Sequence, residues 1–269
     1  MREATVRVWA VVLATIAACA PSTGCAGTRD EIRVYTDSIV DPGEFEIEAH
    51  FNSIPRPRTA VPAGGETRAV DGVILTPELS YGLTRTIELE VGLFWPFART
   101  SDDTSFRISP EVRLKWMPSR GADDDDDDDD DSRWFYGAIL EWSPRRVRPS
   151  DARSSVDLRP VLGWRSRRWL FAANLILEWP LGGSAPRSPE FSPAFKTVRT
   201  MSPGFGLGIE YHGELGRLND RLPANQQLHT LYLTFDFAKP VNLHFGIGHG
   251  LNPQSGAWSI KGSVEIPLN

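Results

Sequence analysis

The 269-residue chain lacks features that mark several common protein classes. It has two cysteines, Cys19 and Cys25, and both lie in or beside the extreme N-terminus. A mature chain cleaved after Ala26 would have no cysteine, which excludes a disulfide framework and a cysteine-ligated metal site. The formal net charge of −6 argues against a nucleic-acid partner.

Long apolar runs and enzyme signatures are also missing. Beyond the N-terminus, no apolar run approaches the roughly 20 residues that a membrane-spanning helix needs. The sequence contains no G-x-S-x-G, H-E-x-x-H or P-loop motif. We therefore predict a protein that is not an enzyme, with no catalytic residue, no cofactor and no metal ligand.

The N-terminus has the pattern of an export signal. Arg2 and Arg7 precede an apolar stretch at 8–18, and small residues follow as far as Ala26. We expect residues 1–26 to be a signal peptide and residues 27–43 to be an N-terminal periplasmic segment. Residues 16–19 also resemble a bacterial lipobox, so lipidation at Cys19 is the alternative to cleavage after Ala26.

From residue 44 onward, apolar and polar residues alternate with a period of two, as in half-buried strands. Near the C-terminus, Leu231, Leu233 and Phe235 alternate with Tyr232 and Thr234. Gly, Pro, Asn and Asp clusters divide the chain into twelve such segments, an even number with short turns on one side, as in bacterial outer-membrane barrels. The expected strands cover about 44–52, 72–81, 87–91, 106–116, 134–142, 156–164, 169–179, 190–198, 205–212, 230–237, 242–248 and 258–266.

The two faces of these strands indicate two different surroundings. The apolar faces end in aromatic residues, and the chain has nine Trp and thirteen Phe. A bilayer selects strands of about ten residues with aromatic ends, and it forbids open sheet edges. The sequence therefore predicts an all-β fold, a closed antiparallel transmembrane β-barrel of about 12 strands over residues 44–269, in the bacterial outer membrane.

The polar faces should then line the lumen, where carboxylates outnumber cations. Two interpretations remain open: a salt-bridge network that fills a narrow barrel, and a small cation-tolerant pore. The side chains expected to line the lumen are Glu46, Glu48, Glu88, Glu90, Arg107, Glu111, Arg113, Glu141, Arg159, Glu178, Glu210, Asp236, His244, Lys261 and Glu265.

Four other features have a structural and a functional interpretation. The aspartates at 123–131 are expected to be a solvated insertion rather than a cation collector. His249 and Ser255 faintly resemble a hydrolase pair, but alternation points His249 toward lipid. The arginines at 145–153 either form an ordinary loop or hold lipopolysaccharide phosphates. The alternate glycines at 204–208 and 246–250 are expected to leave lumen space or to receive an aromatic ring from the next strand.

Several segments resemble a known family. The segments are IRVYTDSIVDPGEFEIEAHFN at 32–52, PELSYGLTRTIELEVGLF at 77–94, GLGIEYHGELG at 206–216, GIGHGLN at 246–252 and WSIKGSVEIPL at 258–268. Together they resemble an outer-membrane transporter family associated with the meta-pathway of phenol degradation. The resemblance implies a β-barrel that passes small molecules, often aromatic or hydrophobic, and it carries over no functional residue.

The sequence thus favours a passive channel for small solutes. The alternative is a closed structural or ligand-binding barrel without a pore, and a lipid-modifying barrel enzyme is a third hypothesis. The expected partners are outer-membrane lipid, lipopolysaccharide and an unidentified small solute, with no nucleic acid.

Overall fold

The structure is a computed structural model that describes residues 32–54, 72–98, 108–119, 132–144, 154–182, 188–238, 241–255 and 258–268. Several sequence predictions lie outside these residues. They concern the signal peptide, lipidation at Cys19, the lumen position of Arg107, the aspartate run at 123–131 and the arginines at 145–153.

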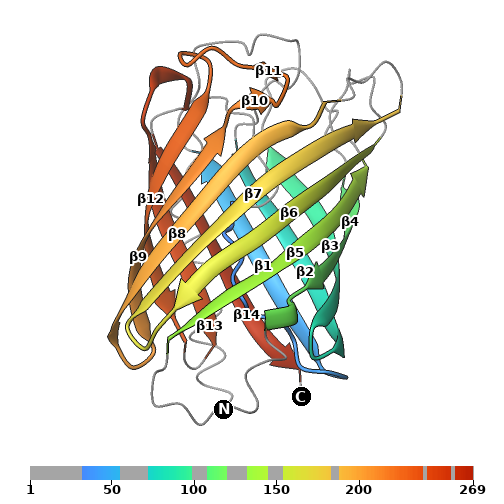
Figure 1. Cartoon of the computed structure of the whole chain (residues 1–269), viewed down its shortest axis with the longest axis vertical. Helices are drawn as coiled ribbons and strands as arrows, with labels where there is room; N and C mark the ends of the chain where they lie inside the picture. Colours follow the sequence, from blue (N-terminus) through green and yellow to red (C-terminus); the bar gives the residue numbers. More distant parts are fainter. Residues whose placement is uncertain are drawn as a thin grey trace.

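Twelve long antiparallel strands form a closed barrel, as the alternation predicted (Figure 1). A two-strand hairpin, β10 (Gly216–Arg217) and β11 (Asp220–Arg221), lies outside the wall, at the top of the view. A short 3-10 helix spans Pro253–Ser255. The wall strands are β1 (Phe45–Ile54), β2 (Gly72–Thr84), β3 (Ile87–Ala98), β4 (Ser109–Trp116), β5 (Arg133–Pro144), β6 (Ser154–Arg165), β7 (Trp169–Leu181), β8 (Glu190–Ser202), β9 (Phe205–Glu214), β12 (Leu228–Phe237), β13 (Asn242–Gly250) and β14 (Trp258–Leu268).

The first and last strands close the wall. β1 pairs with β14 from Phe45 opposite Leu268 to Ser53 opposite Ile260. β9 pairs directly with both β8 and β12, so the β10–β11 hairpin interrupts no wall pairing. Since neighbouring strands are antiparallel, the turns at 85–86, 166–168 and 203–204 share one end of the barrel with the start of β1 and the end of β14.

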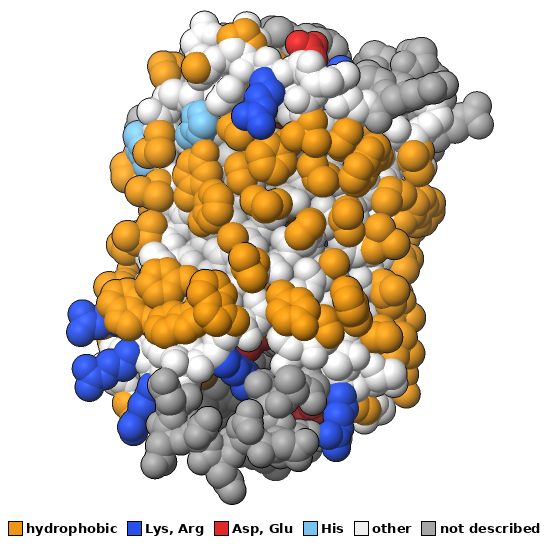
Figure 2. All heavy atoms as spheres, in the orientation of Figure 1, with side chains coloured by type: hydrophobic (Ala, Val, Ile, Leu, Met, Phe, Trp, Pro, Cys, Tyr) orange, Lys and Arg blue, Asp and Glu red, His pale blue; other side chains and the backbone are white. Residues whose placement is uncertain are grey.

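The outer face is apolar, and it carries aromatic side chains near both ends. Apolar side chains form two bands across the visible face, and Lys and Arg side chains lie beyond the lower band (Figure 2). Exposed aromatic side chains include Trp116, Trp134, Trp142 and Trp258. This is the pattern that interfacial girdles give a transmembrane barrel. In the part of the chain that the structure describes, no helix is long and apolar enough to cross a membrane.

The inner face is polar over most of its area, and it encloses more than wall side chains. Residues 32–40, which belong to the expected segment 27–43, run along the inside of the wall. Val34, Tyr35, Asp37 and Ile39 are all buried there. These side chains belong to an extended segment without a strand partner along most of its length, and they find hydrogen-bond and apolar partners on the inner wall.

Candidate functional site

We call residues 32–43 the internal segment, and its contacts with the wall define the candidate site. The segment enters the lumen at the end of the barrel with the short turns. There Pro42 forms a bridge with Gly82 of β2, and Gly43 donates to the Gly82 carbonyl at 2.8 Å. A Cβ at Gly82 would lie 2.1 Å from the Asp41 carbonyl oxygen, so only glycine lets the two backbones come this close.

Asn174 of β7 holds the backbone of the internal segment at Tyr35. The Tyr35 amide donates to Asn174 Oδ1 at 2.6 Å, and Asn174 Nδ2 donates to the Tyr35 carbonyl at 3.0 Å. One fully buried amide side chain thus satisfies both polar groups of a residue that has no strand neighbour.

The ring of Tyr35 lies among cations. Its centroid is 4.9 Å from the Arg33 guanidinium carbon, 5.3 Å from Lys115 Nζ and 5.7 Å from the Arg159 guanidinium carbon. A ring face attracts cations at such distances, and the attraction increases when water is excluded. Two of these three cations belong to the wall, so the wall itself provides a place suited to an aromatic ring.

Charged contacts also fix the segment nearer to the short turns. Asp37 is buried and accepts hydrogen bonds from Arg165 and, at 3.2 Å, from Arg133. The Val40 amide donates to Glu88 Oε2 at 2.7 Å. Wall residues of both signs therefore take part in holding the segment.

An apolar patch on the inner wall receives the segment. Val34, Tyr35 and Ile39 share one buried cluster with wall residues of β5 to β8 and with the residue that follows β4. The wall members are Met117, Phe135, Ile139, Val161, Ala172 and Ala194. Alternation predicted a polar lumen face, so this apolar patch was not expected. Its signal was present in Phe135 and Ile139, which alternate with the outward Trp134 and Leu140.

Arg33 and Ile32, at the start of the segment, also contact the wall. Arg33 donates to Glu48 of β1 and, at 3.0 Å, to Glu265 of β14. Lys261 donates to the Ile32 carbonyl at 2.9 Å. Glu48 lies directly opposite Glu265 on one side and Glu78 on the other, so three carboxylates line up across β14, β1 and β2. Like charges opposite one another destabilise a sheet, and the Arg33 guanidinium offsets that repulsion.

Two wall networks account for most of the other expected lumen residues. In the first, Arg113 contacts four carboxylates, those of Glu78, Glu90, Glu111 and Glu141. Lys115 pairs with Glu88 and Glu90, and Arg159 pairs with Glu141 and Asp157. These groups are buried, and they make the wall from β2 to β6 rich in carboxylates.

The second network centres on Glu210 of β9, on the opposite stretch of wall. Lys196 and Lys261 both pair with Glu210, and His212 and His244 approach it at 3.2 and 3.4 Å. Lys196 and His244 also contact Asp236. Bases therefore surround the carboxylates on this side.

The side chains that were expected to line the lumen differ in their burial. Glu48, Glu88, Glu90, Glu111, Arg113, Glu141, Arg159, Glu210 and Lys261 are buried, while Glu46, Glu178, Asp236, His244 and Glu265 are half-buried. One group of acidic and histidine side chains in the described residues lies close enough to share one metal ion, Glu48, His50 and Glu78.

Two further expectations concerned glycines and a histidine. The ring of Tyr232 covers Gly248 on the neighbouring strand, where an added Cβ would lie 2.3 Å from the ring. This confirms the expectation that such a glycine admits an aromatic side chain. His249 is on the outer face, with its ring centroid 4.8 Å from that of Trp258. Ser255 instead donates to Asn252 and accepts from the His229 amide.

No protein-family model and no curated protein matches the chain. Solved structures do match. The chain resembles the COG4313 outer membrane channel from Pseudomonas putida F1, with 13% identity and a TM-score of 0.56 over 88% of this chain and 100% of that one. It also resembles the NanC porin, with 9% identity and a TM-score of 0.50 over 84% of this chain and 99% of that one. At such identities the likeness shows the fold, which is that of outer-membrane barrels.

Proposed function

We propose that this protein is an outer-membrane channel for small solutes, and that its own internal segment closes the lumen. The observation that carries the proposal is the position of residues 32–43. They lie along the inner wall, and every contact described for them is non-covalent. A segment held by hydrogen bonds, ion pairs and apolar packing can leave the lumen without breaking a covalent bond.

The wall that the segment covers supports a preference for small aromatic solutes. Tyr35 is 3% exposed and packs beside Phe135, Ile139 and Val161 in the same cluster. Lys115 and Arg159 lie near its ring face. Once the segment has left, an aromatic solute could use the same apolar and cationic neighbours. This agrees with the resemblance to the phenol meta-pathway transporters, and that link remains part of the proposal.

The test compares the full mature chain with a variant that lacks residues 27–40 but keeps the Pro42–Gly82 bridge. Heat-modifiable gel mobility first establishes that both barrels are folded. In planar bilayers we expect steady ohmic steps from the deletion variant and rare or short openings from the full chain. Leu218→Ser, in the exposed β10–β11 hairpin, is the matched control and should behave like the full chain.

The same experiment separates the alternative, a closed structural or ligand-binding barrel. The charged networks of Arg113 and Glu210 favour that alternative, because they fill lumen space without help from the segment. If both folded proteins are silent, the closed barrel is correct and the channel proposal is wrong. Equal conductance from both would show that residues 27–40 do not close the lumen.

A further inference from the structure

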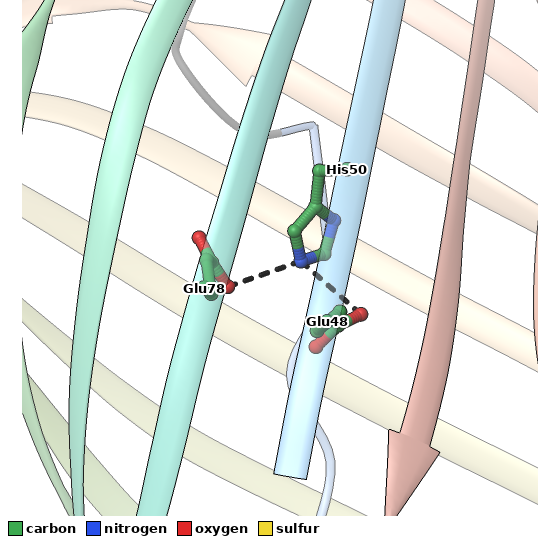
Figure 3. Close-up of side chains that lie close together, drawn as sticks. All are labelled: Glu48, His50 and Glu78. Carbon is green, nitrogen blue, oxygen red and sulfur yellow. Dashed lines mark ion pairs between the residues drawn. The ribbon is translucent and has the colours of Figure 1, made fainter.

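Glu48, His50 and Glu78 form a compact group on two neighbouring strands (Figure 3). Glu48 and His50 are two residues apart on β1, so both side chains point into the lumen. Glu78 lies directly opposite Glu48 on β2. All three are at least nine-tenths buried, with exposures of 4%, 4% and 3%. The strand pairing thus fixes the positions of three metal-ligating side chains on a rigid wall.

The distances within the group suit a metal ion. His50 Nε2 lies 3.1 Å from Glu48 Oε1 and 3.1 Å from Glu78 Oε2. The ligand atoms of the three residues all lie within 4.8 Å of one another. Zn²⁺ binds nitrogen and carboxylate oxygen at about 2.0–2.2 Å in a tetrahedron, which separates neighbouring ligand atoms by roughly 3.3 Å. Small side-chain rotations would bring this group to that geometry.

The other oxygen of each carboxylate is already held by an arginine. Glu78 Oε1 accepts a hydrogen bond from Arg113 at 2.6 Å, and Glu48 Oε2 accepts one from Arg33. Arg113 can keep this role with a metal bound, because outer hydrogen bonds commonly orient metal-binding carboxylates, whereas Arg33 also approaches His50 Nε2. The arginines therefore leave Glu48 Oε1 and Glu78 Oε2 directed at the ring nitrogen of His50.

Hydrogen bonding alone satisfies this arrangement poorly. A ring nitrogen either donates one proton or accepts one. Two carboxylate oxygens and Arg33 Nη1, at 3.4 Å, all approach His50 Nε2. At most one of the two buried oxygens, Glu48 Oε1 or Glu78 Oε2, can accept a linear hydrogen bond from a single Nε2 proton. A metal ion would bind the nitrogen lone pair and both oxygens at the same time.

We propose that Glu48, His50 and Glu78 form a lumen site for a divalent transition-metal ion, with Zn²⁺ as the best match, and that the ion competes with Arg33. Arg33 approaches the same nitrogen lone pair that a metal needs, and its charge would repel a cation beside it. The ion and the docked internal segment therefore disfavour each other, and the coupling is reciprocal. The metal site stands on the wall geometry alone, whereas its effect on the segment rests on the proposed channel function.

Zn²⁺ binding to the folded full mature chain tests the site, with a purification tag free of histidine. Isothermal titration should give one Zn²⁺ per barrel, with Mg²⁺ binding far more weakly because the group includes an imidazole. His50→Gln should weaken Zn²⁺ binding about tenfold or more. His249→Gln, on the outer face, is the matched control and should leave the affinity unchanged. Arg33→Gln should strengthen Zn²⁺ binding by about tenfold, a typical coupling between two sites.

Two results would overturn the metal site: no Zn²⁺ binding even by the Arg33→Gln protein, or equal binding by the wild type and His50→Gln. Weaker binding by Arg33→Gln would contradict the competition, since the guanidinium would then be supporting the bound ion. Conductance with and without Zn²⁺ tests the channel separately. A barrel that binds Zn²⁺ but conducts no ions would support the metal site and contradict the channel proposal.

Discussion

Glu48 of β1 and Glu265 of β14 are direct cross-strand partners at the seam of the barrel, and Arg33 of the internal segment donates to both. The direct cross-strand neighbour of each carboxylate is the other one, so the β1–β14 register places no lysine or arginine opposite either. A residue from outside the wall thus offsets the charge at the seam. This relation links the stability of the wall to the position of the segment.

Arg33→Gln should destabilise the folded barrel. Removing one partner of a buried ion pair costs about 3–5 kcal/mol in general, and a half-buried Glu265 and incoming water should reduce that cost here. The temperature at which heat-modifiable mobility is lost should fall, and Arg33→Lys should restore part of it. Arg167→Gln, in the exposed β6–β7 turn, is the control and should leave that temperature unchanged. An unchanged temperature for Arg33→Gln would mean that the seam needs no cation.

Asn174→Ala should release the internal segment without changing the charge of the lumen. It removes two hydrogen bonds to the Tyr35 backbone, and leaving such buried groups unsatisfied costs about 1–3 kcal/mol. Combining Asn174→Ala with the deletion of residues 27–40 completes a double-mutant cycle, which measures the coupling between Asn174 and the segment. We expect the loss of thermal stability to be much smaller in that background. An equal loss in both would show that Asn174 acts only within the wall.

Leu233→Arg tests the lipid-facing side of the wall. Leu233 is 47% exposed near the middle of β12, between Ile209 and Ile247 of the neighbouring strands. An Arg at the bilayer midplane costs about 2–4 kcal/mol. The measurement is the free energy of folding into lipid vesicles, with Leu218→Arg in the β10–β11 hairpin as a control of similar exposure. Equal costs at the two positions would contradict the membrane orientation.

Ion selectivity should follow the excess of lumen carboxylates. With the segment deleted, we expect reversal potentials under a salt gradient to show cation preference, because fixed negative charge concentrates cations. Glu265→Gln should reduce that preference. Anion selectivity would instead mean that Arg113, Lys115 and Arg159 determine the narrowest point.

Deleting the aspartates at 123–131 should leave folding and conductance nearly unchanged. Nine adjacent carboxylates repel one another and cannot form a core. Loop length has little effect on closure entropy, at about 0.6 kcal/mol per doubling. Gel mobility and single-channel conductance provide the measurement. Loss of folded mobility, or a several-fold change in conductance, would support the cation-collector hypothesis.

The barrel itself could be predicted because a strand exposes its two faces to different solvents. The alternation in the sequence matches the two faces of β12. Leu231 and Leu233 lie on the outer face, and Tyr232 and Thr234 lie on the inner face. Strand ends were less predictable. The third strand was expected to stop near Val91, but β3 continues to Ala98. Gly92 and Pro96 weaken the alternation there without ending the pairing with β2.

The candidate site could be predicted only in part. Alternation places Glu48 and His50 on one face, but the position of Glu78 opposite Glu48 depends on the register between β1 and β2. The contacts of the internal segment with the inner wall could not be predicted, because an extended stretch that pairs with no strand leaves no periodic signal. Its partners Asn174 and Glu265 lie 139 and 232 residues away from the residues that they contact.

The seam has a consequence for the order of assembly. Arg33 is 15 residues from Glu48 in the chain but 232 residues from Glu265. Contacts between residues so close in sequence form with little loss of chain entropy, whereas β14 follows the other wall strands in chain order and must find β1 across the whole barrel. The guanidinium can therefore be in place on the free edge of β1 before β14 arrives. It would then act as a template for closure, because the final strand meets a cation at that edge instead of a bare carboxylate.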